Sequence, residues 1–477
     1  MAGKDDKGKV TAQDGTAGPK KLDRRDVLKG LSTVPALGLF GYAWQKQRRY
    51  QQAKIEGAAA APVASGDLRV INVALLGAGA QGQVLTDAML RIPGLRFRAV
   101  CDVWTEYNQK RVVNQLKKFK HDVNAYEDYR EMLDKEKELD AVVVATPDFW
   151  HSQHAVDCLK AGKHVYCEKE MSNTLEGARA MVAAARDTGK LLQIGHQRRS
   201  NPRYLHCYEK LLGEAKLLGR IVTINGQWNR AVTPDLGAPD RYAIPEARLK
   251  RYGFKDMHQF RNWRWYKSLG GGPIVDLGSH QIDIYTWFLG VNPSHVTASG
   301  GQLYYDPKTH EWYDTVMAVY DYNTPAGPVK AYYQTQTTNG SQGYFENFMG
   351  DQGTLLISES EAHAAKLYRD TNAPAWDTWV QKGYVTAPKV QEVKEKDDAA
   401  VTDVRESVSP DEHMVPIVLR DPYHQPHLQN FFNAVRGKAK LNCPAEIGYE
   451  SAVSVLKVNE AIEANSRLSF KPEDFKA

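Results

Sequence analysis

The sequence predicts an α/β protein with an N-terminal doubly wound parallel sheet and a C-terminal α+β domain that has an open, mostly antiparallel sheet. Three observations lead to this prediction. From residue 68 to residue 194, apolar runs of strand length alternate with helical patterns, which is typical of a parallel sheet covered by helices. The first apolar run ends in a glycine-rich turn. After about residue 196, aromatic and β-branched runs alternate with polar stretches.

The elements of the N-terminal domain follow one another at short intervals. Apolar stretches predict strands at Ile71–Leu76, Phe97–Cys101, Ala141–Thr146, Val165–Cys167 and Leu191–Gly195. Helical patterns between them predict helices near residues 80–91, 105–119, 126–134, 152–161 and 174–188. Sheets of this kind bind their ligands at the carboxyl ends of the strands, so the residues that follow each strand are the first candidates for a site.

The C-terminal domain is less regular. Strand patterns occur at Arg220–Trp228, Thr315–Tyr322, Val329–Thr337 and Gly353–Ser358. Residues 231–258 and 370–422 are polar and contain proline, which predicts extended loops. A last helical pattern, Ser451–Ala464, predicts a helix that packs at the edge of the fold.

The glycine-rich turn has the sequence GAGAQG, with Gly77, Gly79 and Gly82 in the spacing G-x-G-x-x-G. The first glycine permits a tight strand-to-helix turn, the second lets the backbone approach a pyrophosphate, and the third lets the helix pack on the strand. The helix N-terminus adds unpaired N–H groups and partial positive charge. The next strand ends in Asp102, which could accept hydrogen bonds from an adenosine ribose. Strand, loop, helix, strand and acid in this order predict a Rossmann domain that binds a dinucleotide.

The same acid bears on the type of cofactor. A carboxylate at position 102 would repel a 2′-phosphate, and no arginine follows it directly. We therefore expect NAD, with NADP less favoured.

Further polar residues follow two later strands. Thr146, Pro147 and Asp148 come after one, and Glu168 and Lys169 come after the next. Because the carboxyl ends of parallel strands share one edge of the sheet, these residues are expected near the dinucleotide. Lys169 is flanked by acids directly after a buried strand, which favours a functional role over that of a solvated side chain.

A third candidate is GGGPIVDLGSHQID (residues 270–283), in which Asp276 and His280 are four residues apart and would share one helix face. A carboxylate beside an imidazole can hold its tautomer and favour its protonated form, as a general base requires. A capping aspartate with a structural histidine fits the spacing equally well. Metal binding would need more ligands than this helix supplies.

Aromatic and basic residues form a fourth candidate: Trp228, Asn229 and Arg230, then RNWRWY from Arg261 to Tyr266. Such residues can stack on sugar C–H faces and hydrogen-bond to hydroxyl groups, although aromatic clusters are more often part of a core.

Composition excludes other classes of function. Residues 1–65 carry 12 Lys or Arg against 6 Asp or Glu, whereas the rest of the 477-residue chain carries 50 against 51. The folded body is therefore nearly neutral, which argues against nucleic acid as a partner. The five cysteines form no C-x-x-C pair and have no metal-ligand spacing, so we expect buried thiols and no metal site.

The N-terminal segment resembles a twin-arginine export signal. Arg24 and Arg25 precede a mildly apolar run from Gly30 to Trp44, which is too short for a comfortable membrane span. An ordinary buried helix is the alternative, and the basic stretch at 45–54 could instead mark an uncleaved membrane tether. Twin-arginine export carries folded proteins. We therefore expect a periplasmic protein, possible tethering to the membrane, and a cofactor that is loaded before export and stays bound.

Taken together, these motifs resemble the glucose–fructose oxidoreductase and inositol dehydrogenase family (Gfo/Idh/MocA). The resemblance spans about residues 68 to 465 and rests on GAGAQG, the CD at 101–102, the ATP at 145–147, AGKHVYCEK at 161–169, GHQRRSNP at 195–202 and GGGPIVDLGSHQID. It implies an NAD(P)-dependent oxidoreductase that transfers hydride at a CH–OH group of a sugar, glycoside or cyclitol. It also implies a homo-oligomer, dimer or tetramer, assembled through the open sheet.

The resemblance assigns roles to residues of this chain. Lys169 matches the lysine that binds the reacting hydroxyl, and Asp276 and His280 match the acid–base pair. Arg198 and Trp263 are expected to contact the carbohydrate together with these three. The expected cofactor contacts are Gly77, Gly79, Ala80, Gln81, Gly82, Asp102, Thr146, Pro147, Asp148, Trp150, His151, Glu168, Lys169 and Gln197.

One position departs from the family pattern, which usually has proline after the lysine. Position 170 is Glu, and proline fixes φ and permits a cis bond, so the backbone that presents Lys169 could differ here.

The sequence thus predicts a leader and linker (1–65), an NAD-binding Rossmann domain (66–195) and a substrate and oligomerisation domain (196–477). An NAD-dependent glycosidase that acts by transient oxidation and elimination is the alternative activity. A sugar-binding protein without catalysis is less favoured, because Lys169, Asp276 and His280 are all present.

Overall fold

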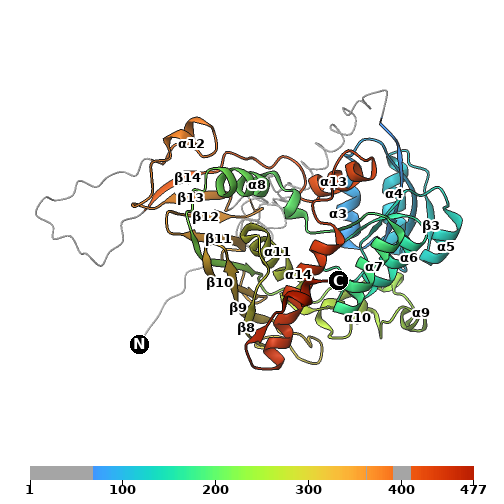
Figure 1. Cartoon of the computed structure of the whole chain (residues 1–477). Helices are drawn as coiled ribbons and strands as arrows, with labels where there is room; N and C mark the ends of the chain where they lie inside the picture. The colour runs from blue at the N-terminus through green and yellow to red at the C-terminus, as the bar shows by residue number, and fades with distance from the viewer. Residues whose placement is uncertain (1–67, 361–362, 390–409) are drawn as a thin grey trace, which may run out of the picture. The chain divides into compact units, whose positions relative to one another are not determined.

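The computed structural model describes residues 68–360, 363–389 and 410–477 (Figure 1). The leader predicted over residues 1–65 lies outside these ranges, and with it the predictions of export and of a membrane tether. Within the described residues the chain forms two sheets in sequence order.

The first sheet has six parallel strands in the order β3-β2-β1-β4-β5-β6, as predicted for a doubly wound domain. The order reverses between β1 and β4, which opens a crevice at their carboxyl ends. Its strands are β1 (Ile71–Leu76), β2 (Leu95–Cys101), β3 (Asn124–Tyr126), β4 (Ala141–Val144), β5 (His164–Cys167) and β6 (Leu192–Ile194). Its helices are α3 (Ala80–Met89), α4 (Lys110–Lys118), α5 (Tyr129–Lys135), α6 (Asp148–Lys160) and α7 (Leu175–Thr188).

The second sheet has nine strands, in the order β14-β13-β12-β11-β7-β10-β9-β8-β15. Only β7 and β10 pair in parallel, so the prediction of a mostly antiparallel sheet is confirmed for the described residues. Its strands are β7 (Ile221–Asn229), β8 (His295–Gly301), β9 (Thr315–Thr324), β10 (Gly327–Gln336), β11 (Tyr344–Gly350), β12 (Gly353–Ile357), β13 (Ala365–Arg369), β14 (Asp411–Met414) and β15 (Leu468–Ser469).

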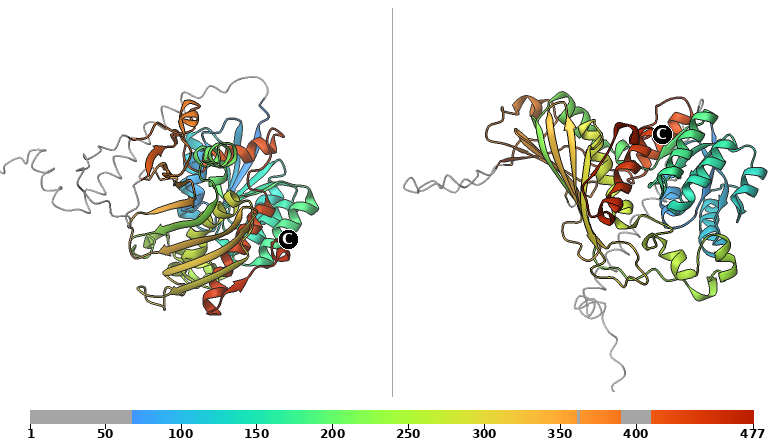
Figure 2. Two further views of the ribbon diagram at one scale, coloured as in Figure 1. Left: turned by 60° about the vertical axis from the view of Figure 1, so that its left-hand side comes forward. Right: turned by 60° about the horizontal axis from the view of Figure 1, so that its bottom comes forward.

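One face of this second sheet is covered by helices and the other is open (Figure 2). Along β9, buried Val316, Ala318 and Tyr320 alternate with exposed Met317 and Val319. Because neighbouring side chains of a strand point to opposite faces, this alternation separates a core face from a solvent face.

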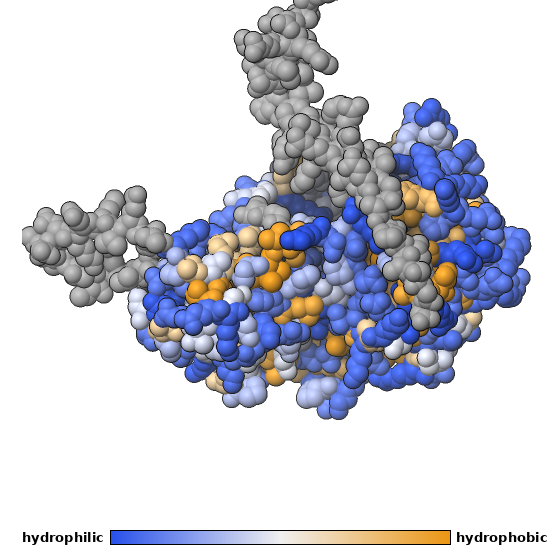
Figure 3. Space-filling model, turned by 90° about the horizontal axis from the view of Figure 1, so that it is seen from above, coloured by the Kyte–Doolittle hydropathy of each residue, from blue (hydrophilic) through white to orange (hydrophobic). Residues whose placement is uncertain are grey.

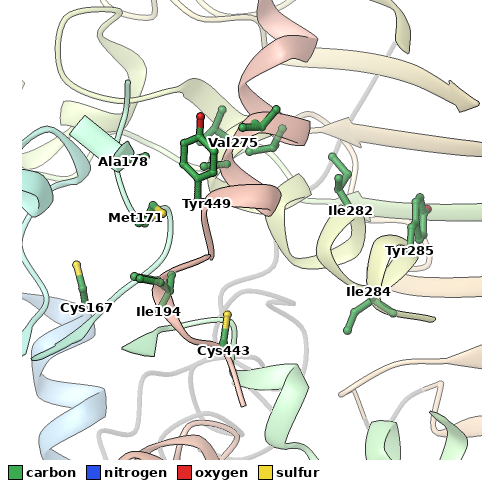
Figure 4. Close-up of a cluster of buried hydrophobic side chains, with 14 of the residues drawn as sticks. Cys167, Met171, Ala178, Ile194, Val275, Ile282, Ile284, Tyr285, Cys443 and Tyr449 are labelled. Atoms are coloured by element: carbon green, nitrogen blue, oxygen red, sulfur yellow. The ribbon is translucent and has the colours of Figure 1, made fainter. Parts of the chain in front are cut away.

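Two long helices pack on the core face: α11 (Gly272–Leu289) and α14 (Ala445–Glu463). Tyr449 of α14 and Val275 of α11 belong to one buried cluster with Met171 and Ala178 of the first domain (Figure 4). The sequence prediction for the last helix was wrong in two respects. The helix begins at Ala445 rather than Ser451, and most of its length is buried in the core instead of lying at the edge.

The predicted loop at 231–258 is partly helical. It contains the start of what we name the covering segment (residues 238–269), with α9 (Glu246–Arg251) and α10 (Met257–Arg261). Its side chains form a small separate core with Trp104 of the first domain, made of Trp104, Ile244, Leu249, Phe254, Trp263, Tyr266 and Leu269. The covering segment is therefore docked on the Rossmann domain.

Short helices complete the described fold: α8 (Pro202–His206), α12 (Asp377–Gln381) and α13 (Gln425–Val435). The face drawn in Figure 3 is largely hydrophilic, and its hydrophobic residues gather in separate patches. All five cysteines are free and buried, as expected. No helix among the described residues has both the length and the apolar character needed to span a bilayer.

Candidate active site

A cavity of about 1000 Å³ lies at the carboxyl ends of β1, β4 and β5 and is closed on other sides by α11 and the covering segment. It brings together nearly all the residues that the sequence singled out. Those that line it are Gly77, Gly79, Ala80, Gln81, Asp102, Thr146, Pro147, Asp148, Trp150, His151, Glu168, Lys169, Gln197, Trp263, Asp276 and His280. Two predicted contacts, Gly82 and Arg198, are not in its wall.

The glycine loop is shaped by close backbone packing. Gly77 has a φ of +96°, and a Cβ there would lie 2.6 Å from the carbonyl carbon of Ala145. A Cβ on Gly82 would overlap the carbonyl oxygen of Gly77, so this glycine serves the packing of α3 and not the cavity wall. A Cβ on Gly79 would meet no atom within 4 Å, which leaves open space beside the start of α3.

The N-terminus of α3 has the features of an anion-binding site. No side chain caps the helix, and no acidic residue occurs in its first turn. Its first N–H groups and the helix dipole therefore face a space into which a pyrophosphate fits. The residues present thus match a dinucleotide.

Asp102 has a structural role that the sequence did not reveal. One carboxylate oxygen accepts a hydrogen bond from the Ala78 N–H at 2.7 Å, and the other accepts from the Trp104 N–H at 2.7 Å. Burial raises the pKa of Asp102, and these two N–H groups oppose that shift. The carboxylate fixes the glycine loop, and each oxygen retains a lone pair for a ribose hydroxyl.

The loop after β4 is tied to the loop after β5 through His151. Its ring nitrogens lie 2.7 Å from the carbonyl oxygens of Thr146 and Glu170. Burial lowers the pKa of His151 to about 4, so the ring is neutral near pH 7 and its single N–H donates to one of these two carbonyls at a time. Trp150 donates from its indole N–H to the Tyr252 carbonyl at 3.2 Å, which links this loop to the covering segment. The contact with the Glu170 carbonyl holds in place the backbone that directly follows Lys169.

Lys169 and Asp276 lie together although they come from different domains. The Lys169 ammonium donates to the main-chain carbonyl of Asp276 and lies 3.2 Å from its carboxylate oxygen Oδ1. Arg264 and Arg230 lie 3.2 Å and 3.8 Å from the same carboxylate. Burial alone would raise the pKa of Asp276, but the charges of Lys169, Arg264 and Arg230 outweigh it and hold that pKa well below its usual range.

The expected pairing of Asp276 with His280 is not formed: no hydrogen bond or ion pair joins them in the described part of the chain. The physical reason is charge, because Asp276 faces cations that helical spacing does not show. The ring of His280 instead lies 5.5 Å from that of Trp228, and its Nδ1 is buried without a hydrogen-bond partner among the described residues. Burial, and then the positive charge of Lys169, lower the pKa of His280 well below its usual range.

Glu168 and Glu170 flank the lysine and are both buried. Burial raises the pKa of Glu168 to about 7 and that of Glu170 to about 8. The Lys169–Glu170 peptide bond is cis even though residue 170 is not proline. Glu170 accepts a hydrogen bond from the Met171 N–H at 2.8 Å and does not contact Lys169 through its carboxylate.

Arg198 was predicted to contact the substrate, but its side chain is 1% exposed and lies behind the cavity wall. Its guanidinium pairs with Glu346 and Glu359 and lies over the rings of Trp228 and Tyr344. Its neighbour Gln197 does line the cavity and donates to Glu359 at 3.4 Å. Arg198 therefore supports aromatic residues of the wall from beneath.

Several wall residues were not predicted. Tyr344 stacks on Trp228, with ring centroids 4.4 Å apart, because β11 pairs with β7 at that register. His424, from the chain before α13, lies 3.3 Å from the amide of Gln81. Neither carries a local sequence signal, since both reach the cavity through long-range packing. Among the described residues no group of three or more His, Cys, Asp or Glu side chains is arranged to hold a metal ion.

Comparison with known proteins agrees with this architecture. A profile described as the oxidoreductase family with an NAD-binding Rossmann fold matches residues 71–196, and the GFO/IDH/MocA C-terminal domain profile matches residues 210–356. Levoglucosan dehydrogenase of Pseudarthrobacter phenanthrenivorans is 26% identical over 225 residues, which cover 46% of this chain and 51% of that protein. Inositol 2-dehydrogenase of Rubrobacter xylanophilus is 29% identical over 203 residues, which cover 42% and 53%.

The chain thus spans about half the length of these curated relatives. A solved structure of levoglucosan dehydrogenase with NADH and L-sorbose shares the fold, with a TM-score of 0.62 and 16% identity over 85% of this chain and 100% of that one. From its two profile matches and its two sheets, the chain belongs to the Gfo/Idh/MocA oxidoreductase family.

Proposed function

We propose that the protein is an oxidoreductase that transfers a hydride between NAD and a hydroxyl-bearing carbon of a sugar, glycoside or cyclitol. One observation carries the proposal: the glycine loop and the group Lys169, Asp276 and His280 line the same cavity. A dinucleotide on the loop and a carbinol beside the lysine would therefore share one cavity. The names of the matched relatives, which are sugar and inositol dehydrogenases, support the same class of reaction.

When bound, the nicotinamide supplies the acceptor for the hydride. The chain's own residues bind the substrate and move its proton. Lys169 donates a hydrogen bond to the reacting hydroxyl and stabilises negative charge that develops on its oxygen. Asp276 holds the lysine in place. His280 is neutral near pH 7 and accepts the hydroxyl proton.

We propose NAD as the preferred cofactor. The Asp102 carboxylate at the end of β2 supports this preference, because it disfavours a neighbouring 2′-phosphate.

The test is to incubate the purified protein with NAD and a panel of sugars and cyclitols and to follow the absorbance of reduced nicotinamide. We expect reduction with at least one compound and a keto sugar or lactone as product. A sugar released from a glycoside with no net reduction would instead establish the glycosidase activity. No reaction with any compound, together with no nucleotide binding, would refute the proposal.

We further propose that the protein is exported by the twin-arginine route to the periplasm, a proposal that rests on Arg24 and Arg25 before a mildly apolar run.

We also propose that the cofactor stays bound between turnovers. The covering segment supports cofactor retention, since its residues line the cavity and bind the Rossmann domain beside it. Arg248 donates to Glu127 and to the Val103 carbonyl, each at 2.8 Å, and Tyr252 donates to Glu127 at 2.7 Å. Trp104 donates to the Tyr242 carbonyl at 2.6 Å.

These contacts predict the behaviour of Arg248→Ala. Loss of the ion pair should loosen the covering segment and raise the dissociation rate of NADH by about tenfold or more, since ordering of a closing segment limits release. Stopped-flow competition of bound NADH against excess NAD measures this rate. Arg186→Ala, an exposed arginine of α7 that pairs with Glu446 away from the cavity, is the matched control. An unchanged rate in Arg248→Ala would remove the covering segment from cofactor retention.

We also propose a homo-oligomer, a dimer or a tetramer, that assembles through the open face of the second sheet. Exposed Met317 and Val319 on that face support it, as does half-buried Tyr332 beside them. Light scattering during gel filtration measures the assembly directly, and a monomer at micromolar concentration would contradict it.

A further inference from the structure

The substrate end of the cavity carries more positive than negative charge. Lys169, Arg230 and Arg264 all lie within 4 Å of one carboxylate, that of Asp276. A single carboxylate balances only one of these cations. Among the described residues, no other ion pair reaches Lys169, Arg230 or Arg264, so the surplus persists in the cavity wall.

The other acids of the cavity wall offset this surplus only in part. Asp148 and Glu168 are buried without an ion pair, and burial raises the pKa of each to about 7. The remaining acids are bound elsewhere: Asp102 by backbone N–H groups, Glu127 by Arg248, Asp128 by the Arg130 N–H, Asp235 by His258 and His310, and Glu359 by Arg198.

The two arginines are held in position for a ligand. The Arg264 guanidinium lies 4.3 Å from the ring centroid of Trp263, and the Arg230 guanidinium lies 5.3 Å from that of Trp228. Their side chains are 45% and 49% exposed, and both line the cavity. The terminal nitrogens of Arg264 make no hydrogen bond to a described residue. Stacked guanidinium groups with free N–H donors bind a carboxylate with two parallel hydrogen bonds.

Building on the proposed function, we propose that the sugar substrate carries a carboxylate, as a uronate does, and that Arg230 and Arg264 bind this group. The aromatic rings of Trp228, Trp263 and Tyr344 line the cavity with these arginines and offer faces for the sugar C–H groups. Asp276 then has two tasks: it positions Lys169, and it orients the guanidinium groups. The sugar is therefore bound at the reacting hydroxyl by Lys169 and at the carboxylate by the two arginines.

The test compares sugars that differ only in charge, D-glucose with D-glucuronate and D-galactose with D-galacturonate. We expect kcat/KM for the uronate of at least one pair to exceed that for its neutral partner by about tenfold or more, the worth of one charge-assisted contact. Arg264→Gln and Arg230→Gln should each lower this ratio by about tenfold or more, mainly through KM for the uronate. Arg264→Lys keeps the positive charge but loses the two parallel N–H donors of the guanidinium. Its ratio of kcat/KM values, uronate over neutral sugar, should lie between those of wild type and Arg264→Gln.

The control is Arg186→Gln, an exposed arginine of α7 that pairs with Glu446 away from the cavity. It should leave the ratio unchanged. Glucose 6-phosphate tests whether the two arginines bind a phosphate instead of a carboxylate. A higher kcat/KM for glucose 6-phosphate than for glucuronate would overturn the carboxylate assignment. A neutral sugar preferred by wild type, or variants that lose NADH affinity instead of uronate affinity, would also overturn it.

Calorimetric binding of D-glucuronate to the NADH-loaded protein separates this inference from the proposed function. If glucuronate binds and Arg264→Gln abolishes binding while no sugar is oxidised, the carboxylate site stands and the proposed reaction fails. If neutral sugars are oxidised and neither glucuronate nor galacturonate binds or reacts, the reaction stands and the carboxylate site fails.

Discussion

Lys169 shows how one residue depends on groups from distant parts of the chain. Its local sequence places it after a buried strand, but its ammonium is positioned by Asp276 of α11. His280, one helical turn further on, keeps an unpartnered Nδ1 in a pocket that burial makes unfavourable for its charged form. The two side chains therefore divide the work: one stabilises an oxyanion, and the other accepts a proton.

This division predicts that Lys169→Ala and His280→Ala each lower kcat by about 10²-fold or more, the usual contribution of a positioned acid or base. Both variants should still bind NAD, because they leave the glycine loop and Asp102 intact. Steady-state kinetics and fluorescence titration with NADH measure the two quantities. Near-normal turnover in either variant would exclude that residue from the mechanism.

Because the carboxyl group of Glu170 is buried, we expect the free energy of unfolding to depend on pH. Burial raises its folded-state pKa to about 8, so folding favours the protonated acid. The stabilising contribution of the protonated form is complete below the ordinary carboxyl pKa, and it is lost as pH rises toward about 8. Glu170→Gln mimics the protonated acid and should be more stable than wild type by about 1 kcal/mol or more at pH ~8, with little difference at pH ~4.

Urea unfolding of both proteins across this range measures the effect. Glu176→Gln, an exposed acid at the start of α7, is the matched control. A stability difference that does not vary with pH would show that the pKa of Glu170 is the same in the folded and unfolded states.

For individual residues, the sequence predicted which residues belong to the site more successfully than it predicted which partners they contact. Local spacing located the glycine loop, Asp102, Lys169 and His280. The partners of Asp276 could not be predicted, since Arg230 and Arg264 reach it from segments whose approach is set by the tertiary fold. Arg198 was misassigned for the same reason: only the pairing of β11 with β7 brings Glu346 beside it.

At the level of elements, two glycines between β1 and α3 have different roles: one serves packing and the other serves ligand binding. Gly82 contacts the backbone of Gly77, whereas Gly79 has an ordinary φ of −65° and open space around its Cα. Gly82→Ala should therefore lower the free energy of unfolding by about 2 kcal/mol, an overpacking cost. Gly79→Ala should change stability by less than about 0.5 kcal/mol yet weaken NADH binding about tenfold or more, because its methyl group occupies the space for the pyrophosphate.

Chemical denaturation and NADH titration of the two variants check this separation. Equal loss of stability in both, or unchanged NADH affinity in Gly79→Ala, would contradict the assignment of the loop.

Elements with a continuous apolar run were predicted best. Strand β1 was predicted with its observed bounds, because a strand buried on both faces leaves an apolar run that only Asn72 interrupts here. Strand β3 was missed: it has three residues, two of them exposed, and therefore no apolar pattern. The start of α14 was missed because Gly448 interrupts the helical pattern of Ala445–Glu450, although packing against α11 and α7 orders it.

For the whole described unit, the decisive feature is that α11 connects the two domains. The helix packs on the second sheet and carries Asp276 and His280 to the strand ends of the first. The shared buried cluster around Val275 and Tyr449 fixes this arrangement (Figure 4). The shared core fixes α11 against both domains, so specificity rests on the side chains of the cavity wall.

The most direct measurement of the central claim is a crystal structure of the protein with NADH and a bound sugar. Our account predicts the pyrophosphate at the start of α3, with the nicotinamide and one sugar carbinol both beside Lys169 and His280. A dinucleotide bound elsewhere, or a sugar whose hydroxyl groups all lie away from those two side chains, would contradict it.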